Sequence, residues 1–179
     1  MHPCLQLAKK AVENYIKKRE VIELPEGLPK ELTNKKAGVF VTIEKNGKLR
    51  GCIGTYLPTK ENIAKEIIYN AIAAATEDWR FGPIQREELN LLSYTVYILD
   101  LPQQIKNISE LNPKKYGILV RTFTLPPKSA LLLPDLEGID TVEKQISIAC
   151  QKGGIDPLRE KIIIYKFTAK RISEKNDSP

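Results

Sequence analysis

The chain has 179 residues, with 42% hydrophobic and 28% charged side chains and a net charge of +6. This length fits one domain of roughly 100–200 residues with a sizeable core, and the composition excludes a disordered chain. No apolar run approaches the ~20 residues of a membrane span, and the first ten residues lack the apolar segment of a signal peptide. We therefore expect a cytoplasmic protein that has no membrane partner.

Cysteine and histidine are too sparse for most metal chemistry. Cys4, Cys52 and Cys150 lie far apart and show neither a disulfide framework nor the paired spacing of a zinc site. His2 is the only histidine, which excludes a multi-histidine metal site and makes a Cys–His dyad depend on the terminus folding back. We expect no metal and no cofactor.

The positive net charge suggests an anionic partner, such as nucleic acid, a phosphorylated metabolite or an acidic protein. The basic residues nevertheless occur in short pairs, and no run of five or more like charges is present. This scatter favours a solvated lysine-rich surface over a nucleic-acid interface.

Helix and strand signals alternate through the first half of the chain. Apolar residues recur at helical spacing over residues 4–19, and two prolines and a glycine predict an irregular connector at 23–30. The dipeptide Asn46-Gly47 is a strong hairpin signal and predicts that residues 38–44 and 48–56 pair as antiparallel strands. We then expect a helix over 60–76 capped by Thr59, a loop at 78–83, a helical turn near 85–89 and a strand at 93–99.

The second half repeats this order. Residues 117–124 and 129–133 are expected to form strands, a helix capped by Thr141 and ended by Gly153-Gly154 follows, and 161–169 alternates as a long strand. Each half therefore reads strand, strand, helix, strand, which predicts an internal structural repeat. Hairpins with helices to one side indicate an α+β fold of mostly antiparallel sheets with flanking helices. We expect one domain over 1–179, with 170–179 as a loose tail.

Residues 49–56, Leu-Arg-Gly-Cys-Ile-Gly-Thr-Tyr, are the most informative stretch. Glycine weakens a strand, so Gly51 and Gly54 indicate a bulge, a bend, or a place where a ligand or another backbone comes close. In a regular strand Arg50 and Cys52 share a face, and a neighbouring cation favours the thiolate form of a cysteine.

The register of the hairpin decides what surrounds Cys52. A two-residue loop would set Cys52 opposite Val41, whereas a three-residue loop with a bulge at Gly47 would set it opposite Phe40. Cys52 is then either a small buried core residue, which is the commoner fate of a free cysteine, or a reactive thiol.

Other polar residues in the first half are candidates for a site with Cys52. Asp78, Arg80 and Glu88 could bind a substrate or hold a loop through bidentate pairs, and the second role is commoner. Trp79 and Phe81 could line a pocket, although anchoring of the loop to the core is favoured. A nucleophilic Cys52 would need Asp78, Glu88, a lysine or a tyrosine such as Tyr56 as its base, which counts against classical cysteine hydrolase chemistry.

Several motifs in the same order resemble the AMMECR domain family over nearly the whole chain. They include residues 49–56, Asp78 with Arg80-Phe81, Glu88-Leu89, Leu131–Asp135, Thr141–Gln145 and Lys152–Ile155. The resemblance implies an α+β fold with two unequal lobes and a cleft near residues 49–56. It also implies association with a Memo-like protein and a radical S-adenosylmethionine protein, because relatives are fused to them or encoded beside them.

Three functions follow from these observations. The first is an enzyme or binding component with a cysteine-containing cleft for a small anionic substrate, in which Cys52 is the candidate catalytic residue. Its candidate binding residues are Arg50, Gly51, Gly54, Asp78, Arg80 and Glu88. The second is a non-catalytic partner of a Memo-like or radical S-adenosylmethionine protein, and the third is a nucleic-acid-binding module.

Overall fold

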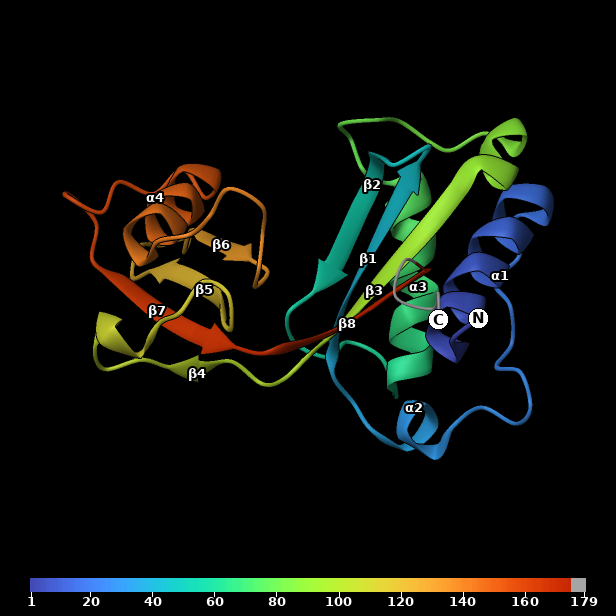
Figure 1. The fold of residues 1–179 in the computed structure, drawn as a ribbon, viewed down its shortest axis with the longest axis horizontal. Helices are drawn as coiled ribbons and strands as arrows, with labels where there is room; N and C mark the ends of the chain where they lie inside the picture. Colours follow the sequence, from blue (N-terminus) through green and yellow to red (C-terminus); the bar gives the residue numbers. More distant parts are fainter. Residues whose placement is uncertain (175–179) are drawn as a thin grey trace. The chain divides into compact units, whose positions relative to one another are not determined.

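The computed structural model describes residues 1–174 and divides the chain into two compact units (Figure 1). Unit 1 comprises residues 1–99 together with the segment that starts at Lys170, and unit 2 comprises residues 100–169. Each unit has its own four-stranded sheet and its own buried core. The α+β fold predicted from the sequence is confirmed.

Unit 1 is a sheet with two long helices on one face. The strand order is β2-β1-β3-β8, with β1 at Gly38–Lys45, β2 at Lys48–Thr55, β3 at Leu92–Leu99 and β8 at Ala169–Ser173. The helices of this unit are α1 (Pro3–Lys18), α2 (Lys30–Asn34), α3 (Ile63–Thr76) and the 3-10 helix η1 (Arg86–Leu91). Helices α1 and α3 contact each other and pack on the sheet (Figure 1).

Unit 2 is smaller and has one long helix, which packs on β5 and β6. The strand order is β4-β7-β5-β6, with β4 at Gln103–Gln104, β5 at Gly117–Thr122, β6 at Ser129–Leu132 and β7 at Ile162–Phe167. The remaining elements are the 3-10 helix η2 (Ile108–Glu110) and α4 (Val142–Lys152). Thr141 caps α4 as predicted, because its hydroxyl accepts a hydrogen bond from the Lys144 amide.

The internal repeat is confirmed by the strand order. In each unit the first strand of the hairpin lies between its partner and the third strand, so β1 corresponds to β5, β2 to β6 and β3 to β7. The strand after the third one joins the opposite sheet, because β4 follows β3 but pairs with β7, and β8 follows β7 but lies beside β3. The prediction of a loose tail is therefore wrong for residues 170–173, which belong to β8, whereas 175–179 lie outside the described residues.

The core of unit 1 follows from strand alternation. The sheet face toward α1 and α3 carries fully buried side chains, those of Val39, Val41 and Ile43 of β1 and Val96 of β3. Ile172 of β8 lies on the same face and is almost completely buried. Because side chains alternate along a strand, the residues between them point to the opposite face of the sheet. The sheet therefore has one face in the core against α1 and α3 and a second face that points away from these helices.

The predicted cap of the second long helix is wrong. Helix α3 begins after Asn62, whose side chain accepts a hydrogen bond from the Lys65 amide, and not after Thr59. Thr59 instead donates its hydroxyl and its amide to Glu66, a carboxylate that is only 1% exposed. A buried carboxylate needs several donors, so it takes the hydroxyl that the sequence pattern assigned to a cap.

Candidate functional site

The hairpin that carries Cys52 contains a tight turn followed by a bulge. Asn46 and Gly47 both have positive φ, 52° and 76°, which is the type I′ geometry of a two-residue loop. The register then shifts between Ile43 and Glu44, so that Arg50 is an extra residue on β2. Beyond the bulge Cys52 lies opposite Thr42. Both predicted registers are wrong, because neither combined a two-residue loop with a bulge.

The two glycines of β2 allow close backbone packing. A Cβ atom on Gly51 would lie 2.1 Å from the carbonyl oxygen of Ala74 in α3. A Cβ atom on Gly54 would lie 2.3 Å from the ring of Phe40 and 2.4 Å from the carbonyl oxygen of Val39. The space that both glycines leave is therefore filled by a helix and by the neighbouring strand.

The sheet face opposite α1 and α3 carries polar and aromatic side chains, and we call it the polar face. Its rows follow from the pairing, since Cys52 lies opposite Thr42 and Thr42 lies opposite Thr95. We define the polar face by Phe40, Thr42, Glu44, Cys52, Ser93, Thr95, Tyr97, Arg171 and Ser173. All of these residues except the exposed Arg171 are buried or half-buried, whereas the solvated side of a sheet exposes most of its polar residues.

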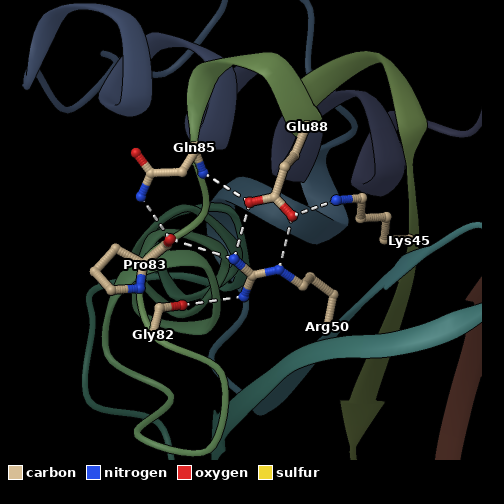
Figure 2. A network of polar contacts seen from close by, with 6 residues as sticks. All are labelled: Lys45, Arg50, Gly82, Pro83, Gln85 and Glu88. Atoms are coloured by element: carbon tan, nitrogen blue, oxygen red, sulfur yellow. Dashed lines mark hydrogen bonds and ion pairs between the residues drawn. The ribbon is translucent and has the colours of Figure 1, made fainter.

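Arg50 does not point to the polar face. The bulge turns its guanidinium toward the segment after α3, where two nitrogens donate to the carboxylate of Glu88 at 3.0 and 2.9 Å (Figure 2). The same guanidinium donates to the carbonyl oxygens of Gly82 and Pro83 at 3.0 and 3.2 Å. Its side chain is only 15% exposed. Arg50 therefore braces this segment against β2.

Glu88 is the acceptor that holds Arg50 and this segment together. Its carboxylate also accepts hydrogen bonds from the Lys45 ammonium and from the backbone amide of Gln85, both at 2.9 Å (Figure 2). Hydrogen bonds from Arg50, with the other donors, lower the pKa of Glu88 to about 2. Arg50 and Glu88 were named as separate candidates, and the structure joins them through contacts that hold this loop.

Asp78 fixes the next loop to the edge of the sheet. β2 is an edge strand, and the outward-facing amide of Cys52 donates to Asp78 Oδ2 at 2.9 Å. Arg80 binds the same carboxylate through Nε at 2.9 Å, Nη2 at 2.7 Å and its own amide at 3.2 Å. These hydrogen bonds, with Arg80 the main cause, lower the pKa of Asp78 to about 2. The carboxylate is thus saturated with donors and stays ionised.

The thiol of Cys52 is half-buried on the polar face and accepts a hydrogen bond from Thr42 Oγ1 at 3.3 Å. Arg80 and Tyr97 lie close enough to interact electrostatically with it. Burial raises the pKa of Tyr97, so its hydroxyl keeps the proton at neutral pH. Asp78 and Glu88 bind cations and backbone amides, so neither carboxylate is poised as a base for the thiol.

The aromatic residues of the 78–83 loop lie outside the core. Trp79 is 90% exposed, so the prediction that it anchors the loop is wrong. Phe81 is 37% exposed, and the Arg80 guanidinium lies over its ring at 5.2 Å from the centroid. The charged contacts of Asp78 and backbone hydrogen bonds hold the loop in place. The indole of Trp79 therefore does not need to pack against the core.

Sequence reasoning missed Thr42 and Tyr97 as neighbours of Cys52, and Thr95 and Arg171 as further residues of the polar face. The alternation of residues 92–99 contains a signal for Thr95 and Tyr97, since they share one face of a predicted strand. Arg171 carried no such signal, because it was assigned to a tail and reaches the site through the strand exchange.

Two further chemical features can be stated for the described part of the chain. Within residues 1–174, no group of three histidine, cysteine, aspartate or glutamate side chains is arranged to hold a metal ion. None of the helices in that range has both the length and the apolar character needed to cross a membrane.

The fold and the site define an α+β protein of two strand-exchanging units, in which a half-buried thiol lies on the polar face of the larger one. The AMMECR1 family model matches residues 5–172, and the chain belongs to this family.

Relatives of known sequence and structure extend this assignment. A protein of Thermotoga maritima is 50% identical over 171 residues, which are 95% of this chain and 97% of that protein. A protein of Clostridium acetobutylicum is 43% identical over 96% of this chain, but the match spans only 36% of that longer protein. The crystal structure of an uncharacterised protein from Pyrococcus horikoshii superimposes with a TM-score of 0.87 at 33% identity, covering 96% of this chain and 90% of that one.

Proposed function

We propose that the chain binds a small anionic molecule at Cys52 on the polar face, as a binding component and not as a cysteine hydrolase. The observation that carries this proposal is the thiol itself, half-buried beside the guanidinium of Arg80. Arg80 is held by Asp78 through Nε and Nη2, and Nη1 makes no hydrogen bond to Asp78. A guanidinium fixed in this way offers an anion a positioned donor at little entropic cost.

The candidate bases argue for binding over nucleophilic catalysis. A nucleophilic thiol needs an acceptor for its proton within hydrogen-bond reach. Here the Thr42 hydroxyl donates to Sγ, and the candidate carboxylates Asp78 and Glu88 are held ionised by their own donors. The candidate residues Gly51, Gly54, Arg50 and Glu88 fit a framework role, in which they keep β2 and the following loops in position.

The sole tryptophan gives a direct test of anion binding. Trp79 lies between Asp78 and Arg80 and is exposed, so a ligand at Arg80 should change its fluorescence. We would titrate the full chain with inorganic phosphate, acetate, oxalate and citrate at constant ionic strength, and follow alkylation of Cys52 by iodoacetamide. The proposal expects at least one anion to change the fluorescence saturably and to slow alkylation at least tenfold.

Matched variants separate a specific site from general charge effects. Cys52→Ser, Thr42→Val and Arg80→Gln should each weaken anion binding at least tenfold, while Arg80→Lys retains part of it. Arg86→Gln makes the same charge change on the exposed residue Arg86 of η1 and should leave binding unchanged. Equal protection by chloride, or equal loss in Arg86→Gln, would contradict the proposal.

A specific observation favours a second function, docking to a protein partner. Trp79 is 90% exposed on a loop that Asp78 holds in place, and tryptophan and arginine are enriched at the energetic centres of interfaces. The Clostridium acetobutylicum relative, in which the matched region is 36% of the length, also supports a domain that works with others. The partner we propose is a Memo-like or radical S-adenosylmethionine protein.

Co-purification with such a partner tests this function. Trp79→Ala should weaken the complex at least tenfold, because an exposed side chain can be removed without loss of core packing. Leu158→Ala removes another side chain, 95% exposed in unit 2, and is the matched control. Failure of the unmodified chain to associate at micromolar concentrations would count against the function.

A further inference from the structure

Three strands of unit 1, β1, β3 and β8, line a small cavity beyond Thr95 as seen from Cys52. The cavity has a volume of about 250 Å³. It is lined by Glu44, Ser93, Tyr94, Thr95, Arg171, Ser173 and Glu174. These residues come from β1, β3 and β8 and, for Glu174, from the position directly after β8, so the site exists only because β8 joins this sheet.

The lining combines two carboxylates, those of Glu44 and Glu174, with one guanidinium and several hydroxyls. Glu44 lies opposite Ser93 in the β1–β3 register, and Arg171 and Ser173 share a face of β8 because Ile172 between them belongs to the core. Between the described residues Glu44 and Arg171 there is no ion pair within 4.0 Å. The two opposite charges therefore line one cavity without neutralising each other directly.

Ser173 is the second observation that points to a ligand. The residue is only 4% exposed, and its hydroxyl has no hydrogen-bond partner among the described residues. Buried hydroxyls in proteins are nearly always paired, and an unpaired one calls for an explanation such as a missing bound molecule. Thr95, which is 9% exposed, adds a further hydroxyl to the same lining.

We propose that this cavity binds a small zwitterion of the α-amino acid class. The ligand carboxylate pairs with the guanidinium of Arg171, and its ammonium pairs with the carboxylates of Glu44 and Glu174. The hydroxyls of Ser93, Thr95 and Ser173 supply further polar contacts. The volume lies below the ~300 to 1,000 Å³ that is typical of sites for drug-sized ligands, which excludes a nucleotide or a folded peptide.

This site goes beyond the anion site at Cys52. It uses neither Cys52 nor Asp78 nor Arg80, and it requires two opposite charges on one molecule. An anion alone would leave Glu44 facing a like charge, and a cation alone would leave Arg171 facing one. The site should therefore bind a zwitterion more tightly than it binds either a simple anion or a simple cation.

The test is an NMR titration of the full ¹⁵N-labelled chain with each of the twenty L-α-amino acids. Acetate and methylammonium serve as the two half-ligands. We expect at least one amino acid to shift the amide resonances of Ser93, Thr95 and Ser173 with a Kd below 10 mM, and both half-ligands to bind at least tenfold more weakly. The absence of any saturable shift, or acetate or methylammonium binding as tightly as the best amino acid, would overturn the proposal.

Charge-removing variants provide the matched controls. Glu44→Gln and Arg171→Gln should each weaken binding of the amino acid at least tenfold, whereas Glu87→Gln and Arg86→Gln change the same residue types at exposed positions of η1 and should not. Dispersed spectra show that each variant is folded. Cys52→Ser should leave this binding unchanged while it weakens anion binding at Cys52 at least tenfold, so the two proposals fail separately.

Discussion

The carboxylate of Asp78 caps the backbone amide of Cys52 at 2.9 Å, on the outer edge of the larger sheet. An edge strand exposes unpaired amides that invite pairing with another chain. Here the amide is closed by a side chain 26 residues further along, which is itself held by Arg80. One carboxylate thus protects the edge, positions the cation beside the thiol and sets the start of the loop that displays Trp79.

Removing this carboxylate should destabilise the fold. Asp78→Ala leaves the Cys52 amide and the Arg80 guanidinium without their acceptor, and we expect a loss of about 2 to 4 kcal/mol in the free energy of unfolding. Urea denaturation followed by circular dichroism measures this loss. Glu77→Ala, at the exposed neighbouring position, is the control and should change stability by less than about 0.5 kcal/mol. Equal effects of the two substitutions would show that Asp78 makes no special contribution.

Stability should fall as the pH is lowered through the acidic range. The pKa values of Asp78 and Glu88 in the folded protein, both about 2, lie below the ordinary values of 3.8 and 4.5. A carboxyl whose pKa is lower in the folded state stabilises that state above its unfolded pKa, and this contribution is lost as pH falls through the folded pKa. Each group should contribute about 2 to 3 kcal/mol at pH 7, lost progressively between about pH 5 and pH 2.

Urea denaturation at a series of pH values from 7 to 3 measures this dependence. Asp78→Asn and Glu88→Gln should each be less stable than the unmodified chain at pH 7 and should lose less stability on acidification. Glu87→Gln, an exposed neighbour of Glu88, should reproduce the original slope. A slope that neither Asp78→Asn nor Glu88→Gln reduces would assign the acid sensitivity to other groups.

Gly51 should not tolerate even one added methyl group. In Gly51→Ala the new Cβ would lie 2.1 Å from the Ala74 carbonyl oxygen, so strand β2 and helix α3 would have to move apart. Overpacking of this kind costs about 1 to 3 kcal/mol, and contact with backbone atoms favours the upper end. Thermal unfolding measures the change, and Leu49→Ala, at an exposed position of the same strand, is the control. A fully stable Gly51→Ala variant would show that the strand and the helix can separate freely.

The sequence predicted the helices and strands better than it predicted how they contact and pair with one another. Hydrophobic spacing and the Asn46-Gly47 turn were sufficient to predict both hairpins and the three long helices, because these signals are local. The bulge at Arg50 depends on how α3 and the 82–88 segment draw the side chain away, which no local pattern contains. The same holds for β8, since its place beside β3 follows from an exchange of strands between sheets.

The candidate site shows the same division between local and long-range information. Asp78, Arg80, Arg50 and Glu88 were named as charged candidates from the sequence, and the structure joins Asp78 to Arg80 and Arg50 to Glu88. Their loop-holding roles depend on backbone donors that only the folded chain supplies, such as the Cys52 amide. The exposure of Trp79 was mispredicted for a related reason, because polar contacts anchor its loop where apolar burial was expected.

The three cysteines should differ sharply in their reaction with iodoacetamide in the native protein. Cys4 is fully buried and Cys150 is 2% exposed, and burial raises the pKa of both thiols, that of Cys4 to about 11. Cys52 is half-buried on the polar face. Because the thiolate is the reactive species, we expect Cys52 to be alkylated first and the other two only when the chain opens.

Mass spectrometry of peptides from a time course of alkylation identifies the modified residue. One equivalent should be incorporated at Cys52, at least tenfold faster than at either buried thiol, and Cys52→Ser should remove this fast phase. In urea above the unfolding transition all three should react at similar rates, since their environments then become alike. A fast phase at Cys4 or Cys150 in the native protein would mean that unit 1 or unit 2 opens locally. Equal native rates for all three thiols would show that Cys52 is not the accessible one, which contradicts the proposed binding at Cys52.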